Sequence, residues 1–337
     1  MLFEDQNTSF FLLKSPWGLL FSNSAPFYSP TPHPQLPSFY INDFFLKSPT
    51  PWAIVPELQI LDKNPISSPE LHSKKADIFD ELSPLEFFET FDDIQNDIQL
   101  GLYEKIVAAA CFKGPAQNLN LQKFIDKAQS AQGRIPYAFS NTQKAILGLS
   151  PEILFSIEGN ELTTMALAGS APSSQSKELL KSSKDIREHQ IVVDAISKKL
   201  APFGQLSIGD IEVAEFGPIS HLKSPIHIKI FDKIDVPTLI KTLHPTPALG
   251  AYPWNEASIY RLKTLREKHG IYPEFGAPFG ILWGEKAFFL VAIRNILKTE
   301  NETLLSTGCG IIKESRREKE WAEILLKKNA VAQGIGL

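Results

Sequence analysis

Apolar residues recur at helical spacing between positions 184 and 200, and one carboxylate falls in line with them. The apolar stripe carries Val192, Val193, Ile196 and Leu200. Glu188 lies one helical turn before Val192 on this stripe, so its side chain is expected to point inward. A carboxylate that faces a core is costly unless it meets a cation or hydrogen-bond donors, which predicts a metal ion or a basic partner. The alternative is a partly solvated acid in the first helical turn, where the helix dipole favours it.

Helical spacing also marks other segments, and strand-like runs fill much of the chain between them. Helices are predicted over residues 86–101, 119–132, 255–268 and 317–332. Strands are predicted over residues 103–112, 137–140, 162–168, 208–216, 221–222 and 226–230, with a meander from 276 to 312. Leu147-Gly148 predicts a turn, and Gly159-Asn160 predicts a hairpin. Residues 1 to about 70 are rich in Phe, Pro and Ser and predict short strands and turns.

Runs of strands with helices between them predict an α+β protein built on large antiparallel sheets, packed together with the helices outside. The aromatic content of the N-terminal part argues against disorder. We therefore expect a strand-rich part, residues 1–85, packed on the same body as residues 86–337, in one large globular domain overall.

Composition narrows the class of protein. With 337 residues and 43% hydrophobic content, the chain can bury a large core. A net charge of −4 without a long basic run does not indicate binding to nucleic acid or an anionic membrane, although small anionic substrates are compatible with it. Two cysteines, Cys111 and Cys309, make neither a disulfide framework nor a metal-binding cluster. No apolar run approaches the ~20 residues of a bilayer span, and Glu4 and Asp5 replace the positive charge of an export signal. We expect a cytoplasmic protein.

Several polar residues stand at positions where chemistry is plausible. Glu152 follows a predicted strand, and Gly169 forms a predicted turn between small residues. Lys105 begins a buried strand, where a lysine is more often a surface residue with a buried stem. In the last helix, Glu323 and Lys327 form an i,i+4 pair of the kind that stabilises solvated helices by ~0.2–0.5 kcal/mol. Because apolar residues share the side that holds Glu320, this face need not be wholly solvent-facing.

Eight motifs follow one another in an order that resembles the chorismate-utilising enzymes. This family includes isochorismate synthases, salicylate synthases, anthranilate synthase component I and aminodeoxychorismate synthase component I. The motifs are EKIVAAA at Lys105, GLSPEIL at Glu152, ALAGSAP at Gly169, KDIREHQIVV at Glu188, LHPTPALGAYP from Leu243, VAIRN at Arg294, STGCGII at Gly308 and Gly310, and EKEWAEILLK at Glu323. The resemblance runs from about Phe87 to Ala332 and implies two α/β halves with the active site between them.

The resemblance assigns roles to these residues. It implies a Mg²⁺ ion held by Glu188 and Glu323, with Glu320 in the outer shell. Glu152 would be the general acid, which requires a raised pKa, and Lys105 the base that activates water. The other implied residues contact the substrate, either through side chains or through backbone N–H groups beside glycines. They are Gly169, Ser170, His244, Thr246, Ala248, Phe275, Arg294, Gly308, Gly310 and Lys327.

Lys105 also discriminates between members of the family. Enzymes that add water carry a lysine here, whereas those that add ammonia from a glutaminase subunit do not. The resemblance therefore favours an isochorismate synthase, an isomerase that converts chorismate into isochorismate, acting as a monomer without a glutaminase partner. A salicylate synthase would use the same lysine and then eliminate pyruvate. A chorismate-binding paralogue without turnover is the alternative of a different class, but the retention of the charged site residues argues against it.

The chain departs from the family pattern at several positions. Ala110 replaces an arginine, Ser170 a threonine, Ala251 a glycine and Cys309 a small residue such as alanine. The segment around Phe275 lacks the usual Arg-Gly pair, so this side of the pocket is expected to have a different shape.

Overall fold

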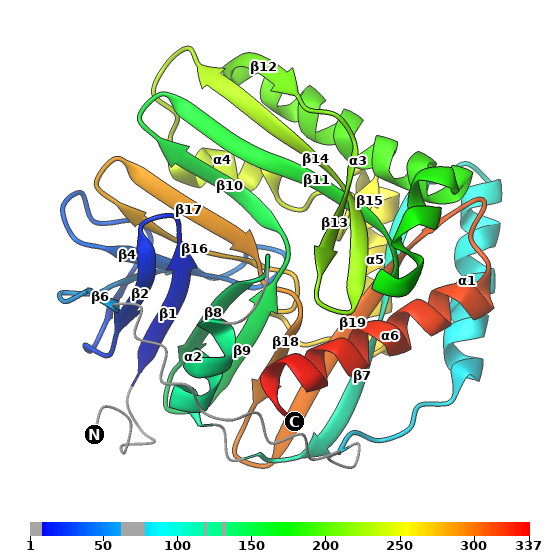
Figure 1. The fold of residues 1–337 in the computed structure, drawn as a ribbon, viewed down its shortest axis with the longest axis horizontal. Coiled ribbons are helices and arrows are strands. Elements are labelled where there is room, and N and C mark those ends of the chain that lie inside the picture. Colours follow the sequence, from blue (N-terminus) through cyan, green and yellow to red (C-terminus); the bar gives the residue numbers. More distant parts are fainter. Residues whose placement is uncertain (1–8, 62–77, 118–119, 130–132) are drawn as a thin grey trace.

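The computed structural model describes residues 9–61, 78–117, 120–129 and 133–337. These residues form two antiparallel sheets, one of nine strands and one of ten, with helices outside them (Figure 1). Glu4 and Asp5, which entered the argument about export, lie outside the described residues. Among the described residues, none of the helices combines the length and the apolar character needed to cross a membrane.

The first sheet has the strand order β15-β7-β19-β18-β9-β8-β1-β2-β6. Its strands are β1 (Phe10–Ser15), β2 (Gly18–Ser22), β6 (Gln59–Leu61), β7 (Lys105–Pro115), β8 (Ile135–Ser140), β9 (Ala145–Ser150), β15 (Ala251–Tyr252), β18 (Asn295–Lys298) and β19 (Glu302–Ile312). The long pair of β7 and β19 places Gly310 opposite Val107 and Ile312 opposite Lys105.

The second sheet has the order β12-β14-β11-β10-β17-β16-β4-β5-β3, and β13 also pairs with β14. Its strands are β3 (Phe27–Ser29), β4 (Ser38–Ile41), β5 (Trp52–Ile54), β10 (Ile153–Glu158), β11 (Glu161–Pro172), β12 (Gly204–Ile208), β13 (Glu212–Phe216), β14 (Ile219–Ile230), β16 (Pro278–Trp283) and β17 (Lys286–Val291). The N-terminal strands therefore extend both sheets.

The helices cover the outer faces of the two sheets. They are α1 (Pro84–Gln99), α2 (Leu121–Gln129), α3 (Ser183–Leu200), α4 (Val236–Leu243), α5 (Glu256–Lys268) and α6 (Arg317–Ile335), with 3₁₀ helices at Ser173–Lys181 and Ala201–Phe203. Helix α3 packs on β11 and β14, whereas α6 packs on β19 and β9. In Figure 1, α3 runs along β14 and β11 and α6, in red, crosses β19 and β7.

Aromatic residues fill the space between the sheets. The rings of Phe11 on β1 and Phe39 on β4 stack with their centroids 4.8 Å apart, and those of Phe139 on β8 and Phe279 on β16 stack at 5.1 Å. Each pair joins one sheet to the other, and all four side chains are buried. A second core lies between the sheets and the helices and includes Val192, Ile196, Ile311 and Ile324.

The expected α+β fold is confirmed, and most predicted elements lie where they were expected. The predicted helix over residues 119–132 is α2, although positions 119 and 130–132 lie outside the described residues. Residues 221–222 and 226–230 belong to one long strand, β14, and not to two. The division at residue 85 stays a prediction.

Two glycines were misjudged. The predicted turn at Leu147-Gly148 is wrong, because both residues lie inside β9. Gly148 is needed for close packing instead, since a Cβ there would lie 2.5 Å from the ring of Tyr137. The predicted turn at Gly169 is a β-bulge inside β11, where the register shifts and Gly169 has a φ of 71°.

Candidate functional site

Two of the points where the chain passes from one sheet to the other lie next to each other, and a candidate site residue lies at each. Glu152 lies between β9 and β10, and Arg294 lies between β17 and β18. The two crossings are joined by backbone hydrogen bonds. The N–H of Val291 donates to the carbonyl oxygen of Glu152, and the N–H of Leu149 donates to the carbonyl oxygen of Arg294. Arg294 has a φ of 54°, which is uncommon for a residue with a side chain and is typical of functional sites.

A cavity opens where the two crossings meet α3 and α6. Its volume is about 610 Å³, including its open mouth. Its polar lining comes from both sheets and from both helices. The lining includes Glu152, Gly169, Ser170, Glu188, His221, Arg294, Gly308, Gly310, Glu323 and Lys327.

Glu152 is a buried carboxyl group with a raised pKa. Glu152 is 3% exposed, and the hydroxyl of Thr246 donates to its Oε1 at 3.5 Å. Burial raises the pKa of Glu152 to about 7, against the opposing effects of Lys105, Thr246 and Lys327. The raised pKa expected of a general acid is therefore present, and its cause is desolvation.

Arg294 is held by a histidine that the sequence reasoning missed. His221 on β14 has Nε2 2.9 Å from Nη2 of Arg294 and Nδ1 2.9 Å from the carbonyl oxygen of Gly169. If Nδ1–H donates to this carbonyl, Nε2 is free to accept from the guanidinium, which requires a neutral ring. Burial, together with the charges of Arg294 and Lys327, lowers the pKa of His221 well below its usual value. The bulge at Gly169 thus fixes the orientation of Arg294 through His221.

Lys105 is fully buried and pairs with Glu188. Its Nζ donates to the carbonyl oxygen of Pro247 at 2.6 Å and lies 3.2 Å from Oε1 of Glu188. The expectation of an inward Glu188 with a basic partner is met, and the alternatives of a surface lysine and a solvated acid do not apply. Gly310 covers this pair, since a Cβ there would lie 2.6 Å from Nζ of Lys105 and would also collide with the carboxylate of Glu188.

The last helix supplies two further carboxylates, Glu320 and Glu323. Nζ of Lys327 donates to Oε1 of Glu323 at 2.6 Å and to the carbonyl oxygen of Gly308 at 2.7 Å. The i,i+4 pair is therefore not a solvated one, because its side chains are only 14% and 15% exposed. Glu320 lies one turn earlier and contacts Lys184, which also pairs with Glu188. Lys184 was missed, although its spacing of four residues from Glu188 was a signal.

The residues expected to hold Mg²⁺ can be tested against this arrangement. Among the described residues, no group of three His, Cys, Asp or Glu side chains lies close enough to form a metal cluster by itself. Mg²⁺ commonly uses one or two protein carboxylates, with water and substrate oxygens completing its shell. Glu188 and Glu320 bind one cation between them, the ammonium of Lys184, and Oε2 of Glu320 is buried without a hydrogen-bond partner among the described residues. These oxygens fit a hard cation.

The structure brings most of the predicted site residues to one cavity, but not all of them. Ala248 and Phe275 join its lining. Lys105 and Thr246 lie just behind the wall, in contact with the lining residues Glu188 and Glu152. Glu320 is connected to the lining residue Glu188 through Lys184. His244 is not brought there, because its Nε2 lies 2.8 Å from the carbonyl oxygen of Phe44 and its ring packs against the Phe44 ring.

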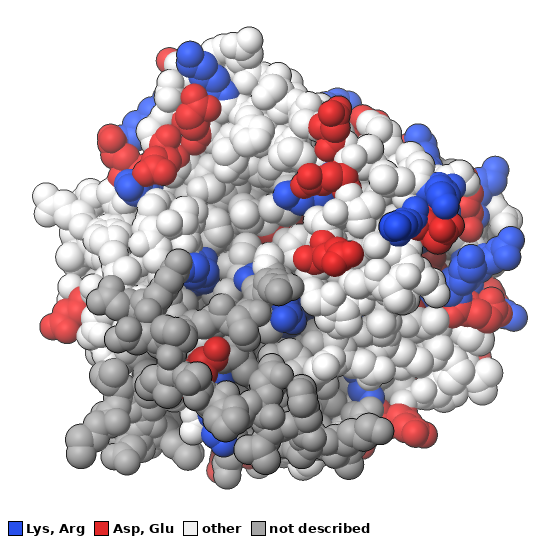
Figure 2. Space-filling view, viewed as in Figure 1, with Lys and Arg blue, Asp and Glu red and all other residues white. Residues whose placement is uncertain are grey.

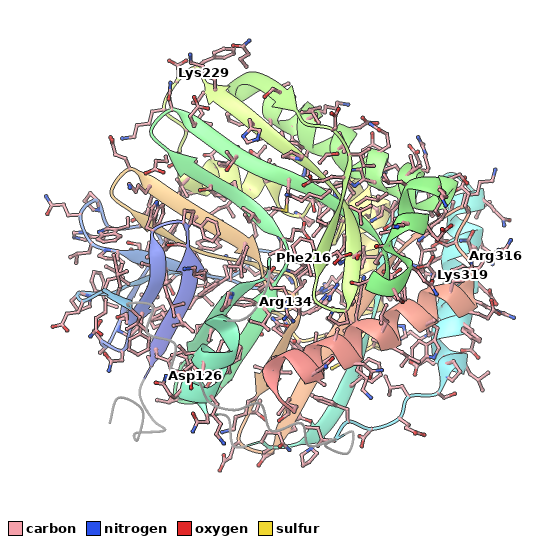
Figure 3. All side chains as sticks on the ribbon, in the orientation of Figure 1. Asp126, Arg134, Phe216, Lys229, Arg316 and Lys319 are labelled. Carbon is pink, nitrogen blue, oxygen red and sulfur yellow. The ribbon has the colours of Figure 1, made fainter. Side chains whose placement is uncertain are left out.

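A second, smaller cavity of about 250 Å³ lies on the other side of Arg294. Arg134 and Phe216 line it together with the end of α6, and Figure 3 shows these two residues next to each other near the centre of the view. On the face drawn in Figure 2, basic and acidic residues are interspersed around the hollow centre.

Three comparisons with known proteins bear on this site. Residues 52–336 match the family model described as chorismate binding enzyme. The salicylate biosynthesis isochorismate synthase of Pseudomonas aeruginosa is 33% identical over 257 residues, covering 72% of this chain and 53% of the relative. The isochorismate synthase MenF of Bacillus subtilis is 28% identical, covering 76% of this chain and 57% of the relative. The chain thus spans about half the length of the curated relatives it matches.

Solved structures share the fold over nearly the whole chain. A putative 2,3-dihydroxybenzoate-specific isochorismate synthase, DhbC from Bacillus anthracis, superposes with a TM-score of 0.82 at 20% identity, covering 99% of this chain and 98% of that chain. The menaquinone-specific isochorismate synthase MenF from Escherichia coli gives a TM-score of 0.77 at 18% identity, covering 98% and 90%. At these identities the likeness concerns the fold alone.

Proposed function

This chain belongs to the chorismate-binding enzyme family, and from that premise we propose that it is an isochorismate synthase. In the proposed reaction water adds to C2 of chorismate and loses a proton, both ring double bonds migrate, and the C4 hydroxyl takes a proton and leaves as water. Substrate and product are isomers. The product would feed menaquinone or siderophore biosynthesis.

The observation that carries the proposal is the buried carboxyl group of Glu152 on the cavity wall. Loss of the C4 hydroxyl requires a proton donor. Burial raises the pKa of Glu152 to about 7, so this carboxyl group can donate a proton near neutral pH. Arg294 and Lys327 line the same cavity. A dicarboxylate such as chorismate therefore finds two cations and one acid within a single site.

Lys105 is the proposed base. It would take a proton from the incoming water, and the missing Cβ of Gly310 allows its Nζ and the carboxylate of Glu188 to lie directly against this lining residue. Two features support the assignment. The side chain of Lys105 is fully buried, and a lysine at this position is the feature of the family that favours water over ammonia as the nucleophile.

Substrate carboxylates would be bound from two sides. Arg294, oriented by His221, faces the cavity from the crossing between β17 and β18. Lys327, anchored by Glu323 and the carbonyl oxygen of Gly308, faces it from α6. Backbone N–H groups beside the glycines can be approached by an anion without a side chain in the way.

The proposal includes Mg²⁺ as the cofactor, held by Glu188 and Glu323 with Glu320 beside them. When bound, the ion would neutralise one substrate carboxylate and hold the ring against Glu152 and Lys105. Glu188 and Glu323 come from helices that cover different sheets, so the binding site requires both halves of the fold.

The test is to incubate the purified chain with chorismate and Mg²⁺ and to separate the products by chromatography. Isochorismate is the expected product, and its absence contradicts the proposal. Salicylate together with pyruvate would move the chain to the salicylate synthases. Lys105→Ala should make no isochorismate, whereas Lys113→Ala, at an exposed position of the same strand, should retain turnover.

A further inference from the structure

One ammonium group bridges carboxylates that belong to different helices. Nζ of Lys184 lies 3.0 Å from Oε2 of Glu188 on α3 and 3.1 Å from Oε1 of Glu320 on α6. It also lies 3.7 Å from Oδ1 of Asp185. Because α3 covers one sheet and α6 covers the other, this lysine links the two halves of the molecule directly behind the cavity.

The two carboxylates need a cation at this place. The side chains of Glu188 and Glu320 are only 7% and 3% exposed, so their mutual repulsion is poorly screened. Burial lowers the pKa of Lys184, but the surrounding carboxylates outweigh burial and raise it well above its usual value. The lysine is therefore a charged counter-ion. The compensation is incomplete, since Oε2 of Glu320 is buried without a hydrogen-bond partner among the described residues.

A divalent ion would compete with this ammonium for the same oxygens. Mg²⁺ binds carboxylate oxygens at about 2.0–2.1 Å, so an ion on the oxygens that lie 3.0 and 3.1 Å from Nζ of Lys184 would sit close to the ammonium, and the two positive charges would repel each other. Lys184 can leave. It lies in the first turn of α3, its side chain is 20% exposed, and its four-carbon stem can carry the charge outward to water.

We propose that Lys184 is a built-in counter-ion of the metal site, which holds Glu188 and Glu320 together until Mg²⁺ displaces it. The inference rests on the proposed function, because that function makes these carboxylates part of the Mg²⁺ site. Two consequences follow. Lys184 weakens the apparent affinity for Mg²⁺ in proportion to the fraction of molecules in which it is bound inward. It also stabilises the contact between α3 and α6 in the metal-free chain.

The experiment measures metal binding without turnover. The full chain is titrated with Mn²⁺, as a paramagnetic substitute for Mg²⁺, in the absence of chorismate, and free Mn²⁺ is followed by electron paramagnetic resonance. Lys184→Gln, which keeps a hydrogen-bond donor but loses the charge, should lower the Kd for Mn²⁺ about tenfold, as expected if the lysine is inward in about nine molecules of ten. The Tm of this variant in EDTA should fall, and its gain in Tm from millimolar Mg²⁺ should exceed that of the unchanged protein.

Lys181→Gln is the matched control. Lys181 ends the 3₁₀ helix that precedes α3, is 71% exposed, and pairs with the exposed Glu178 at 3.2 Å, so its loss should change neither Kd nor Tm. If Lys184→Gln does not fold without metal, the Kd of the Lys184→Arg variant for Mn²⁺ tests the inference instead. A guanidinium can pair with carboxylates in a bidentate manner, so the Kd should rise at least about threefold.

Three outcomes overturn the inference. The first is a Kd for Mn²⁺ in Lys184→Gln that is equal to or higher than the Kd of the unchanged protein. This result would overturn the inference but leave the proposed function intact. An unchanged or lower Kd in Lys184→Arg does the same. If neither the unchanged chain nor Lys184→Gln binds Mn²⁺, the inference fails together with the metal in the proposed function, whereas the product assay still tests the reaction itself.

Discussion

The Nε2 atom of His221 lies 2.9 Å from Nη2 of Arg294, and the opposite nitrogen of the same ring lies 2.9 Å from the carbonyl oxygen of Gly169. A neutral imidazole thus connects the bulge in β11 to the arginine at the crossing between the sheets. Arg294 is 8% exposed and has a left-handed φ of 54°, so its guanidinium depends on this contact for its direction.

Replacing His221 by Ala should weaken the binding of the substrate carboxylate through Arg294. A hydrogen bond to a charged group contributes about 1.5–3 kcal/mol, which corresponds to a loss of roughly 10–150-fold in kcat/KM. Steady-state kinetics with chorismate measure the effect. His227→Ala is the control, because His227 lies exposed on the same strand. Equal kinetics in the two variants would remove His221 from the site.

Gly310→Ala should abolish activity although it adds only one methyl group. The added Cβ would lie 2.6 Å from Nζ of Lys105 and would collide with the carboxylate of Glu188, and both of these groups are buried. We expect kcat/KM to fall at least about 100-fold, because misplacing reacting groups by about 1 Å has an effect of this size. Gly334→Ala in α6 is the control, since its nearest neighbours are ends of flexible side chains at 3.1 and 3.2 Å. Full activity of Gly310→Ala would contradict the arrangement of Lys105 and Glu188.

The raised pKa of Glu152 should appear in the pH dependence of stability. A carboxyl group with a pKa of about 7 in the folded chain and 4.5 when unfolded binds its proton more tightly in the folded state. Its contribution is therefore complete below about pH 4.5 and is lost as the pH rises through about 7, amounting to about 3 kcal/mol. Urea unfolding at about pH 5 and about pH 8 measures it, with Glu152→Gln as the reference that does not titrate. The same pH dependence in both proteins would show that Glu152 does not hold a proton near neutrality.

Glu323→Gln should raise the Mg²⁺ requirement. Loss of this carboxylate removes one proposed ligand and also the partner of Lys327. We expect the Mg²⁺ concentration for half-maximal activity to rise at least about tenfold. The control is Glu318→Gln in the first turn of the same helix, where the side chain is 68% exposed and pairs with Arg317. An unchanged Mg²⁺ response in Glu323→Gln would exclude this residue from the metal site.

The periodicity of the chain was sufficient for most of the fold. The apolar stripe that begins at Glu188 predicted both the helix and the inward direction of its carboxylate, which is 6% exposed. Glycines were the main source of error, because the same residue type serves a turn, a bulge or a close contact. Gly148 lies inside a strand because the ring of Tyr137 packs against it too closely to leave room for a Cβ. This close contact depends on the three-dimensional structure and could not be predicted from the sequence.

Pairwise contacts between distant elements could not be derived from the order of residues. His221 and Arg294 are 73 positions apart and meet only because β14 and the crossing after β17 converge on the cavity. Lys184 reaches Glu188 within its own helix, which spacing alone could suggest, but its contact with Glu320 depends on the packing of α6. Conversely, the proline-rich loop placed His244 near the site in sequence, whereas the fold turns it toward Phe44.

The addition of water at C2 is the central claim, and isotopic labelling tests it most directly. The chain is incubated with chorismate and Mg²⁺ in water enriched in ¹⁸O, and the product is separated and analysed by mass spectrometry. We predict isochorismate that carries one ¹⁸O atom, located in the C2 hydroxyl, because the oxygen at C2 comes from solvent and the C4 oxygen departs. Isochorismate without the label, or the absence of isochorismate, would contradict the account.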